Sequence, residues 1–256
     1  MEMLRKKILG VPIDNLSEID ILEKILKYMA NPKGFFHITS LNPENLVIAQ
    51  ENAEFKKVLL TSQIRIADGI GIVVAAQILD VELKGRVSGV DLMEKLIRLA
   101  SDRRLRVLLI GGRPNLALRL AECYQKKYTE AKFLGTIGFS DIKKPSKDEA
   151  AEIFSIVRHF KPHLIFASFG SPEQELWLAR HDKELSGIVV MGVGGAFDYF
   201  GKIVPRAPRF LRTIGLEWLF RLVVQPWRWK RQLRLITFVW LIILQKFNLD
   251  NGERNS

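Results

Sequence analysis

The stretch "SQIRIADGIGIVVAAQ" (62–77) decides the fold class of this chain of 256 residues. Its first part, "IRIAD" (64–68), is short and apolar like a buried strand. Glycines follow at positions 69 and 71, and the small and apolar residues after them suit a helix. A strand that passes directly into a helix is the repeating unit of α/β proteins. Asp68, at the junction, is either the N-cap of that helix or a carboxylate aimed at a substrate.

The same alternation recurs over the first 200 residues. Amphipathic patterns such as "SEIDILEKILKYMA" (17–30) and "DLMEKLIRLASD" (91–102) separate short β-rich runs, which predicts an α/β domain with a largely parallel sheet flanked by helices. The β-rich runs are "GFFHITS" (34–40), "IRIAD" (64–68), "RVLLIGG" (106–112), "KFLGTIGF" (132–139), "HLIFASFG" (163–170) and "IVVMGVGG" (188–195).

Several of these runs end in glycine or a polar residue. In open α/β sheets the ligand binds in a crevice at the carboxyl ends of the strands. We therefore expect one rim of the sheet to carry Ser40, Asp68, Gly111, Gly112, Gly170, Gly194 and Gly195.

The pattern changes after Phe200, where strand-like segments stop. "PRFLRTIGLEWLFRLVV" (208–224) and "PWRWKRQLRLITFVWLIILQKF" (226–247) predict two helices separated at Pro226, a residue that suits the first turn of a helix. The chain is thus predicted to consist of an α/β core (1–200) and a basic, amphipathic helical appendage (201–256).

Charge is distributed unevenly between these two parts. The net charge is +11, and residues 200–256 hold eleven Lys or Arg against three acidic residues, or +8. Such an excess favours an anionic partner, which is a membrane, a phosphate group or nucleic acid. Nucleic acid is disfavoured because the basic residues alternate with large aliphatic ones and no nucleic-acid motif is present.

An apolar run, "LITFVWLIIL" (235–244), lies in the appendage. Ten residues are too few to span a bilayer, which needs about 20. Large apolar residues nevertheless recur at helical spacing, and basic residues precede them. Such a helix lies in a membrane interface, or packs on its own domain or on a second subunit, and the basic excess favours the membrane. The recurring residues are Trp229, Leu233, Ile236, Trp240 and Ile243.

Other classes of site are disfavoured. Cys123 is the only cysteine, so the chain has no internal disulfide and suits a reducing compartment. Phe197 stands where the third glycine of a dinucleotide fingerprint belongs, which speaks against a nucleotide-dependent oxidoreductase. No P-loop, metal-ligand spacing or nucleophile elbow occurs, so the sequence demands neither a metal nor a cofactor.

Seven motifs in order resemble those of the WecG/TagA/CpsF glycosyltransferases, bacterial enzymes that make cell-surface polymers such as wall teichoic acid. The resemblance covers nearly the whole chain, and seven ordered motifs make it specific. The motifs are "SLNPENLVIAQ", "RIADGIGIV", "GRVSGVDL", "VLLIGG", "ASFGSPEQELW", "GVGGAFDYFGKIVPRAP" and "GLEWLFRL" with "PWRWKR".

This resemblance implies a Rossmann-like core and a helical appendage that docks on the inner face of the bacterial membrane from the cytoplasm. It implies transfer of an N-acetylhexosamine-type sugar, N-acetylmannosamine or a related one, from a UDP-sugar to a polyprenyl-diphosphate-linked GlcNAc. The anomeric centre would be inverted without a metal or cofactor, the UDP-sugar being a substrate. A homo-oligomer is left open.

The resemblance also assigns roles to residues. Asp68 matches the catalytic base, and Ser40, Asn42, Arg86 and Gln174 match residues of the active-site pocket. Appendage arginines would close over the pocket and contact diphosphate: Arg221, Arg228 and Arg231. With Gly111, Gly112, Gly194 and Gly195 at the rim, they form the predicted substrate site.

A second class of function stays open at this point: a non-catalytic basic α/β module that binds acidic lipid or nucleic acid. The two classes differ in what they require of Asp68. A base needs at least one carboxylate oxygen free toward a pocket near Arg86 and Gln174, since backbone N–H groups on both oxygens would lower the pKa.

Overall fold

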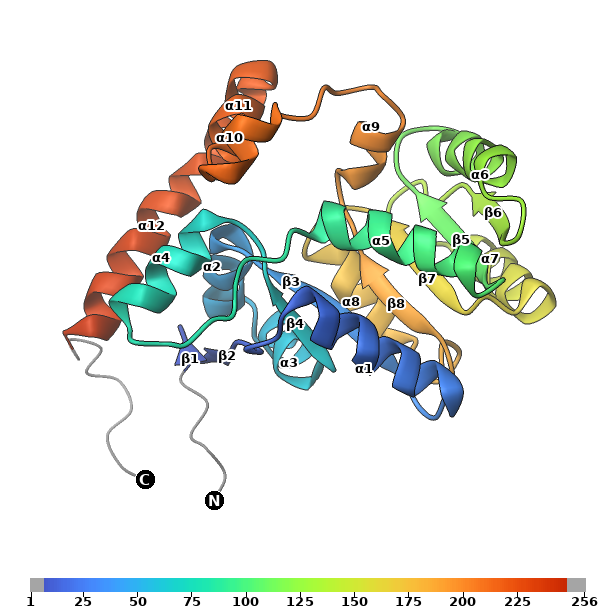
Figure 1. Cartoon of the computed structure of the whole chain (residues 1–256), viewed down its shortest axis with the longest axis horizontal. Coiled ribbons are helices and arrows are strands. Elements are labelled where there is room, and N and C mark those ends of the chain that lie inside the picture. The colour runs from blue at the N-terminus through green and yellow to red at the C-terminus, as the bar shows by residue number, and fades with distance from the viewer. Residues whose placement is uncertain (1–6, 248–256) are drawn as a thin grey trace.

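The computed structural model describes residues 7–247, without the side chains of Arg228, Lys230, Arg231 and Gln232. Its centre is a sheet of six parallel strands in the order β4-β3-β8-β7-β5-β6, which confirms the predicted α/β, Rossmann-like fold class (Figure 1). A separate antiparallel pair, β1 and β2, lies near the N-terminus. The strands are β1 (Lys7–Ile8), β2 (Val11–Pro12), β3 (Phe36–Leu41), β4 (Ile64–Ala67), β5 (Arg106–Gly111), β6 (Lys132–Thr136), β7 (Leu164–Ser168) and β8 (Val189–Gly192).

Helices α1–α8 lie between successive strands from β2 to β8, and the remaining helices follow β8. They are α1 (Glu18–Ala30), α2 (Pro43–Glu51), α3 (Ala53–Thr61), α4 (Ile70–Ile78), α5 (Gly89–Asp102), α6 (Leu116–Lys127), α7 (Lys147–Phe160), α8 (Glu173–Arg180), α9 (Ala196–Phe200), α10 (Arg209–Thr213), α11 (Glu217–Val224) and α12 (Trp229–Lys246), with a 3₁₀ turn η1 (Pro226–Arg228).

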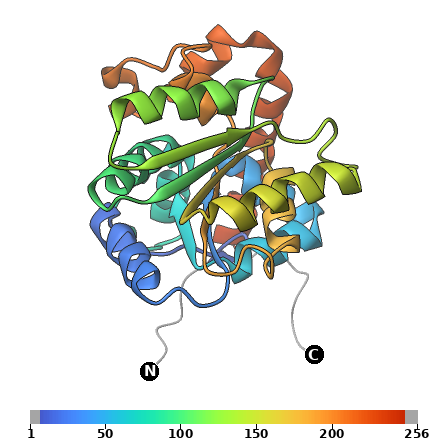
Figure 2. The same cartoon turned by 90° about the vertical axis from the view of Figure 1, so that its right-hand side faces the viewer.

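Helices cover both faces of the sheet, as the two views show (Figures 1 and 2). Side chains alternate along each strand, so one strand supplies both faces. On β5, Val107 and Leu109 pack with α1, α5 and α6, whereas Leu108 and Ile110 pack with α7 and α8. All strands are parallel, so their carboxyl ends meet at one edge of the sheet.

Several helices begin at residues that cap them. Ser17 and Asp20 form a reciprocal capping box at the start of α1, and Ser146 and Glu149 form another at α7. Asn42 caps α2 by accepting a hydrogen bond from the backbone N–H of Asn45. This last cap fixes the chain directly after β3, at the carboxyl edge of the sheet.

The segment after Phe200 differs in one respect from the prediction. The helix expected over 208–224 is divided into α10 and α11, because Gly215 adopts a left-handed φ of 80° between them. Pro226 starts η1, which leads into α12. A glycine inside a periodic pattern is the signal for such a break.

Helix α12 is docked on the core along its length. Its Phe238 and Ile242 are buried in one apolar cluster with residues of α2, α3 and α4. Gln245 accepts a hydrogen bond from Leu9 N and donates one to Lys7 O, each at 2.8 Å. The predicted appendage therefore shares buried side chains with the predicted core.

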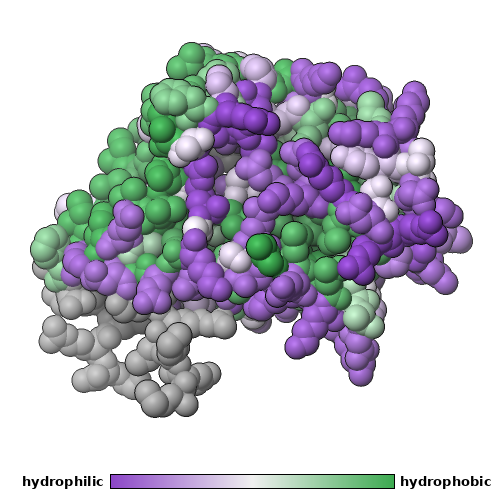
Figure 3. Space-filling model, in the orientation of Figure 1, coloured by the Kyte–Doolittle hydropathy of each residue, from purple (hydrophilic) through white to green (hydrophobic). Residues whose placement is uncertain are grey.

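The opposite face of α12 is exposed. The apolar stripe that the sequence predicts is not packed on its own domain, and green surface covers α10–α12 and α4 in Figure 3. None of the helices within residues 7–247 is long and apolar enough to cross a membrane. The exposed stripe consists of Trp229, Leu233, Ile236, Trp240 and Ile243.

Candidate active site

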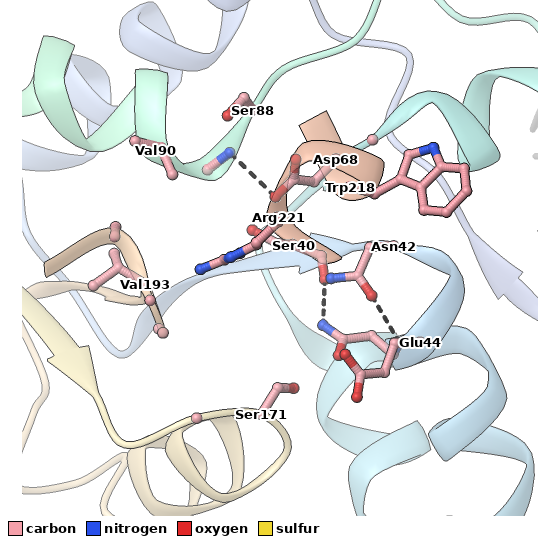
Figure 4. Close-up of a pocket in the computed structure, with 18 of the residues that line it drawn as sticks. Ser40, Asn42, Glu44, Asp68, Ser88, Val90, Ser171, Val193, Trp218 and Arg221 are labelled. Atoms are coloured by element: carbon pink, nitrogen blue, oxygen red, sulfur yellow. Dashed lines mark hydrogen bonds between the residues drawn. The ribbon is translucent and has the colours of Figure 1, made fainter. Parts of the chain in front are cut away.

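A cavity of about 690 Å³ opens at the carboxyl ends of the strands (Figure 4). Five strands bring residues to it, either at their last positions or in the loops that follow. This placement confirms that the rim of the sheet gathers the predicted polar and glycine residues. The lining includes Ser40, Asn42, Asp68, Arg86, Gly112, Gly170, Gln174, Gly194, Gly195 and Arg221.

Gly111 is the exception among the rim residues. It is the last residue of β5 and does not line the cavity. The ring of Phe169 lies against it, at the place where a Cβ atom would be. Its lack of a side chain therefore makes room for Phe169 rather than for a ligand.

Asp68 does not cap the helix that follows it. The N-cap of α4 is Gly69, with a φ of 94° and no side-chain hydrogen bond. Asp68 instead accepts a hydrogen bond through Oδ2 from Gly89 N, the first residue of α5, at 3.3 Å. Within residues 7–247, no donor is bonded to its Oδ1. One carboxylate oxygen is thus free, and Figure 4 shows Asp68 and Arg221 pointing into the same space.

The surroundings of Asp68 favour a base. The pKa of Asp68 is raised from 3.8 to about 6, chiefly by burial and to a smaller extent by the negative charge of Glu217. The hydrogen bond from Gly89 and the positive charges of Arg86 and Arg221 lower this pKa. A carboxylate whose pKa lies near neutrality suits general base catalysis, because at neutral pH it is ionised and is also basic enough to accept a proton.

The two arginines reach the cavity from opposite parts of the chain. Arg86 follows α4, and its Nη2 donates a hydrogen bond to Arg212 O at 2.7 Å. Arg221 lies on α11 with its guanidinium over the Tyr199 ring, 4.7 Å from the ring centre. The Arg221 Nη2 also lies where a Cβ of Gly195 would be. Such a pair of guanidinium groups can bind a diphosphate.

Ser40 and Asn42 form the wall beside α2. Asn45 Nδ2 donates to Ser40 O at 2.8 Å, and Asn42 Oδ1 accepts from Asn45 N at 2.9 Å (Figure 4). The capping bond uses only the carbonyl oxygen of Asn42. Among the side chains that the structure describes, the Asn42 amide nitrogen and the Ser40 hydroxyl have no hydrogen-bond partner.

Gln174 lies deeper than the sequence suggests. It is 4% exposed and hydrogen-bonded to two loops of the cavity. The motif "ASFGSPEQELW" marked Gln174 as a pocket residue, but the sequence did not indicate that it bonds to Gly170 and Gly194.

Three charged residues, of which only Glu217 lines the cavity, form an ion-paired group that was not predicted from the sequence. Arg206 forms an ion pair with Asp91 at 2.7 Å and faces Glu217, with 3.7 Å between Nε and Oε1. Asp91 and Glu217 lie in the first turns of α5 and α11. We call Asp91, Arg206 and Glu217 the clamp, because it joins the helix that holds Arg221 to the helix bonded to Asp68. Asp91 lies in the motif "GRVSGVDL", Arg206 in "VPRAP" and Glu217 in "GLEW". Their place in these motifs is the only feature of the sequence that pointed to them.

Two predicted site residues, Arg228 and Arg231, have side chains outside the described residues. Their backbones belong to η1 and α12. Across the described part of the chain, no three His, Cys, Asp or Glu side chains are grouped so that they could hold a metal ion.

Comparisons with known proteins agree with the geometry. The profile of the glycosyl transferase WecG/TagA/CpsF family matches residues 6–252. Enzymes named N-acetylglucosaminyldiphosphoundecaprenol N-acetyl-beta-D-mannosaminyltransferase are similar to this chain: those of Staphylococcus aureus strains NCTC 8325 / PS 47 and COL are 30% identical over 229 residues, which is 89% of this chain and 87% of theirs. That of strain MRSA252 is 29% identical over the same length. A match over nearly the entire chain shows that the protein belongs to the WecG/TagA/CpsF family of glycosyl transferases.

Proposed function

We propose that this glycosyl transferase moves an N-acetylmannosamine-type sugar from a UDP-sugar to a polyprenyl-diphosphate-linked GlcNAc during bacterial surface-polymer synthesis. The names of the similar staphylococcal enzymes support both the sugar and the acceptor. Membership of the family decides for an enzyme and against a non-catalytic binding module. The observation that carries the proposal is the free Oδ1 of Asp68 in a cavity lined by Arg86 and Arg221.

In the proposed reaction, Asp68 takes the proton of the acceptor hydroxyl. That oxygen forms a bond to the anomeric carbon as the bond from this carbon to the UDP oxygen breaks. A single displacement from the opposite face inverts the anomeric centre. The proton ends on Asp68 and the electron pair leaves with UDP, so a carboxylate within hydrogen-bond reach of the hydroxyl suffices as the base.

The leaving diphosphate gains negative charge as that bond breaks. In our proposal Arg86 and Arg221 stabilise it, since a guanidinium stays charged and bonds two oxygens at once. The left-handed backbone at Gly112 and Gly194 lets the chain approach a ligand closely. We expect no metal requirement, which transfer in the presence of EDTA tests directly.

We further propose that the exposed apolar face of α10–α12 rests on the membrane that holds the acceptor. Trp227, Ile236 and Trp240 are largely exposed, and tryptophan with aliphatic residues is typical of an interfacial helix. Leu235 and Trp218 line the cavity. The cavity thus opens beside the surface that would meet the lipid (Figure 3).

Asp68→Asn tests the proposal. The amide has the shape of the carboxylate but accepts no proton, so we expect transfer to fall by about 10²–10⁴-fold with donor binding retained. UDP release is measured with a panel of UDP-sugars and a short-chain polyprenyl-diphosphate-GlcNAc acceptor. Asp102→Asn, at the exposed end of α5, is the matched control. Undiminished transfer by Asp68→Asn would refute the assignment of the base.

A further inference from the structure

The side chain of Gln174 is bonded to the protein itself. Its Oε1 accepts hydrogen bonds from Gly170 N at 3.2 Å and from Gly194 N at 3.0 Å. Its Nε2 donates to Oε1 of the neighbouring Glu175 at 2.7 Å. One amide group therefore has three protein partners, and its acceptor oxygen is fully used.

The two glycines belong to different loops of the cavity wall. Gly170 follows β7, and Gly194 follows β8. Both have left-handed φ angles, of 89° and 47°, where the backbone forms no regular ladder. A single oxygen atom thus ties together the two loops that close this side of the cavity.

Glu175 determines which way the Gln174 amide faces. Glu175 is 1% exposed and lines the cavity. A flipped amide would place its oxygen against the Glu175 oxygen and its NH₂ group against two backbone N–H groups, so every bond would be lost. Chiefly through burial, the pKa of Glu175 is raised to about 7, against the hydrogen bond from Gln174, which lowers it.

Gly192, the last residue of β8, makes room for this pair. A Cβ atom at Gly192 would lie 2.6 Å from Gln174 Nε2 and 2.7 Å from Glu175 Oε1. A residue larger than glycine at position 192 would therefore displace Gln174 and Glu175 and break the contacts with the two loops.

We propose that Glu175 is a positioning residue: it orients the Gln174 amide, and Gln174 in turn holds the Gly170 and Gly194 loops in the shape that binds substrate. Gln174 then acts through the backbone of the loops and not by contact with the sugar or diphosphate. This role goes beyond the proposed reaction, and it does not depend on which sugar is transferred.

Exchanging the two side chains distinguishes positioning from contact. In Gln174→Glu/Glu175→Gln, a carboxylate at position 174 accepts from both glycine N–H groups and from the new amide at 175, so every hydrogen bond is retained. The exchange nevertheless removes the Nε2 donor from position 174. A positioning role predicts a rate of transfer within about threefold of wild type, because all of the hydrogen bonds are retained and only their strengths change. A contact role predicts that the exchange is as inactive as Gln174→Leu.

The single change Gln174→Glu adds a pH signature. It sets two carboxyl groups side by side, and these cannot both ionise at close range. Transfer relative to wild type should therefore fall as the pH rises from about 6 to 8.5, while the double exchange stays level. Glu175→Leu should lower transfer at every pH in this range, because the Gln174 amide then loses the acceptor that fixes its orientation. Glu173→Gln, a partly exposed neighbour that faces Lys143, is the control.

Amide hydrogen exchange at Gly170 and Gly194 tests the same geometry without any turnover. We expect both amides to be protected in the wild type and in the double exchange, and to exchange about tenfold faster or more in Gln174→Leu, as one lost buried hydrogen bond implies. Unprotected amides in the wild-type protein, or a double exchange no better than Gln174→Glu at pH 8.5, would overturn the proposal. Because this readout uses no donor, a wrong substrate assignment leaves it intact.

Discussion

The guanidinium of Arg221 lies over the ring of Tyr199, 4.7 Å from its centre, and thereby joins α11 to α9. The contact holds a cation beside the cavity in a fixed orientation. Gly195 leaves the space that the guanidinium occupies. Arg221 is thus positioned before any diphosphate binds.

Tyr199→Leu should weaken this positioning while leaving the charge in place. A cation–π contact is worth about 0.5–2 kcal/mol, so we expect kcat/KM to fall by roughly 2- to 30-fold. Tyr28→Phe is the control, because the Tyr28 hydroxyl bonds to Gly34 O far from the site. Steady-state kinetics at saturating acceptor measures the effect, and an unchanged kcat/KM would show that the ring does not orient Arg221.

The pH dependence of transfer should report Asp68. Since the pKa of Asp68 is about 6, its base form is lost as the pH falls through this value, and the rate should fall with it. Glu217 raises this pKa by its negative charge, whereas Arg86 and Arg221 lower it. Glu217→Gln should therefore move the acidic limb of kcat/KM to lower pH. A limb that stays in place or moves upward would contradict this electrostatic description.

Asp68→Asn should stabilise the fold at neutral pH. The folded pKa of about 6 exceeds the ordinary 3.8, so the folded protein holds its proton more tightly and loses stability as the pH rises from about 4 to 6. Two units of pKa correspond to at most about 3 kcal/mol. Urea unfolding at pH 4 and at pH 7.5 should give a difference between variant and wild type that grows with pH. Asp102→Asn should show no such growth.

The clamp should behave as one unit. Arg206 is 19% exposed in its side chain and pairs with Asp91, so Arg206→Gln and Asp91→Asn each remove the same ion pair. In a double-mutant cycle on kcat/KM we expect a coupling of about 0.5–3 kcal/mol. Arg98→Gln, which breaks the exposed Arg98–Glu94 pair on α5, is the control and should be silent. Strict additivity would mean that the clamp does not couple the two helices.

Membrane docking predicts a contrast between two equally exposed isoleucines. Ile236 on α12 and Ile19 on α1 are both 69% exposed. Ile236→Glu should lower binding to phosphatidylglycerol vesicles by about tenfold or more, since burying an isoleucine side chain is worth about 1.5–3 kcal/mol. Ile19→Glu should not affect binding. Sedimentation with vesicles measures both, and equal effects would rule out α12 as the docking face.

Much of the fold could be predicted from local sequence. Each predicted strand of the sheet is present, and the alternation of strands and helices dictates parallel pairing and hence the rim at which Asp68 lies. Ends were less certain: the strand expected over 132–139 stops at Thr136. The division at Gly215 depends on a single backbone conformation that helical periodicity does not reveal.

The partners of the site residues could not be predicted in the same way. Asp68 bonds to Gly89, and Arg86 to Arg212 O, across 21 and 126 positions of the chain. Such contacts arise only when strands and helices are assembled. The resemblance to a family indicated which residues line the cavity, but the orientation of Gln174 follows from buried neighbours that no local pattern specifies.

Gly69, the residue after Asp68, has a backbone conformation that only glycine adopts without strain. Nothing lies within 4 Å of where its side chain would project, so a methyl group there would meet only open space. Other amino acids are excluded from position 69 by the backbone, because a φ of 94° with a ψ of 154° is open to glycine and strained for every other residue. Relief of that strain would turn the peptide that follows Asp68 and swing the carboxylate with it. The direction of the Asp68 carboxylate, which is the base in our proposal, therefore depends on the backbone of a neighbouring residue that has no side chain of its own.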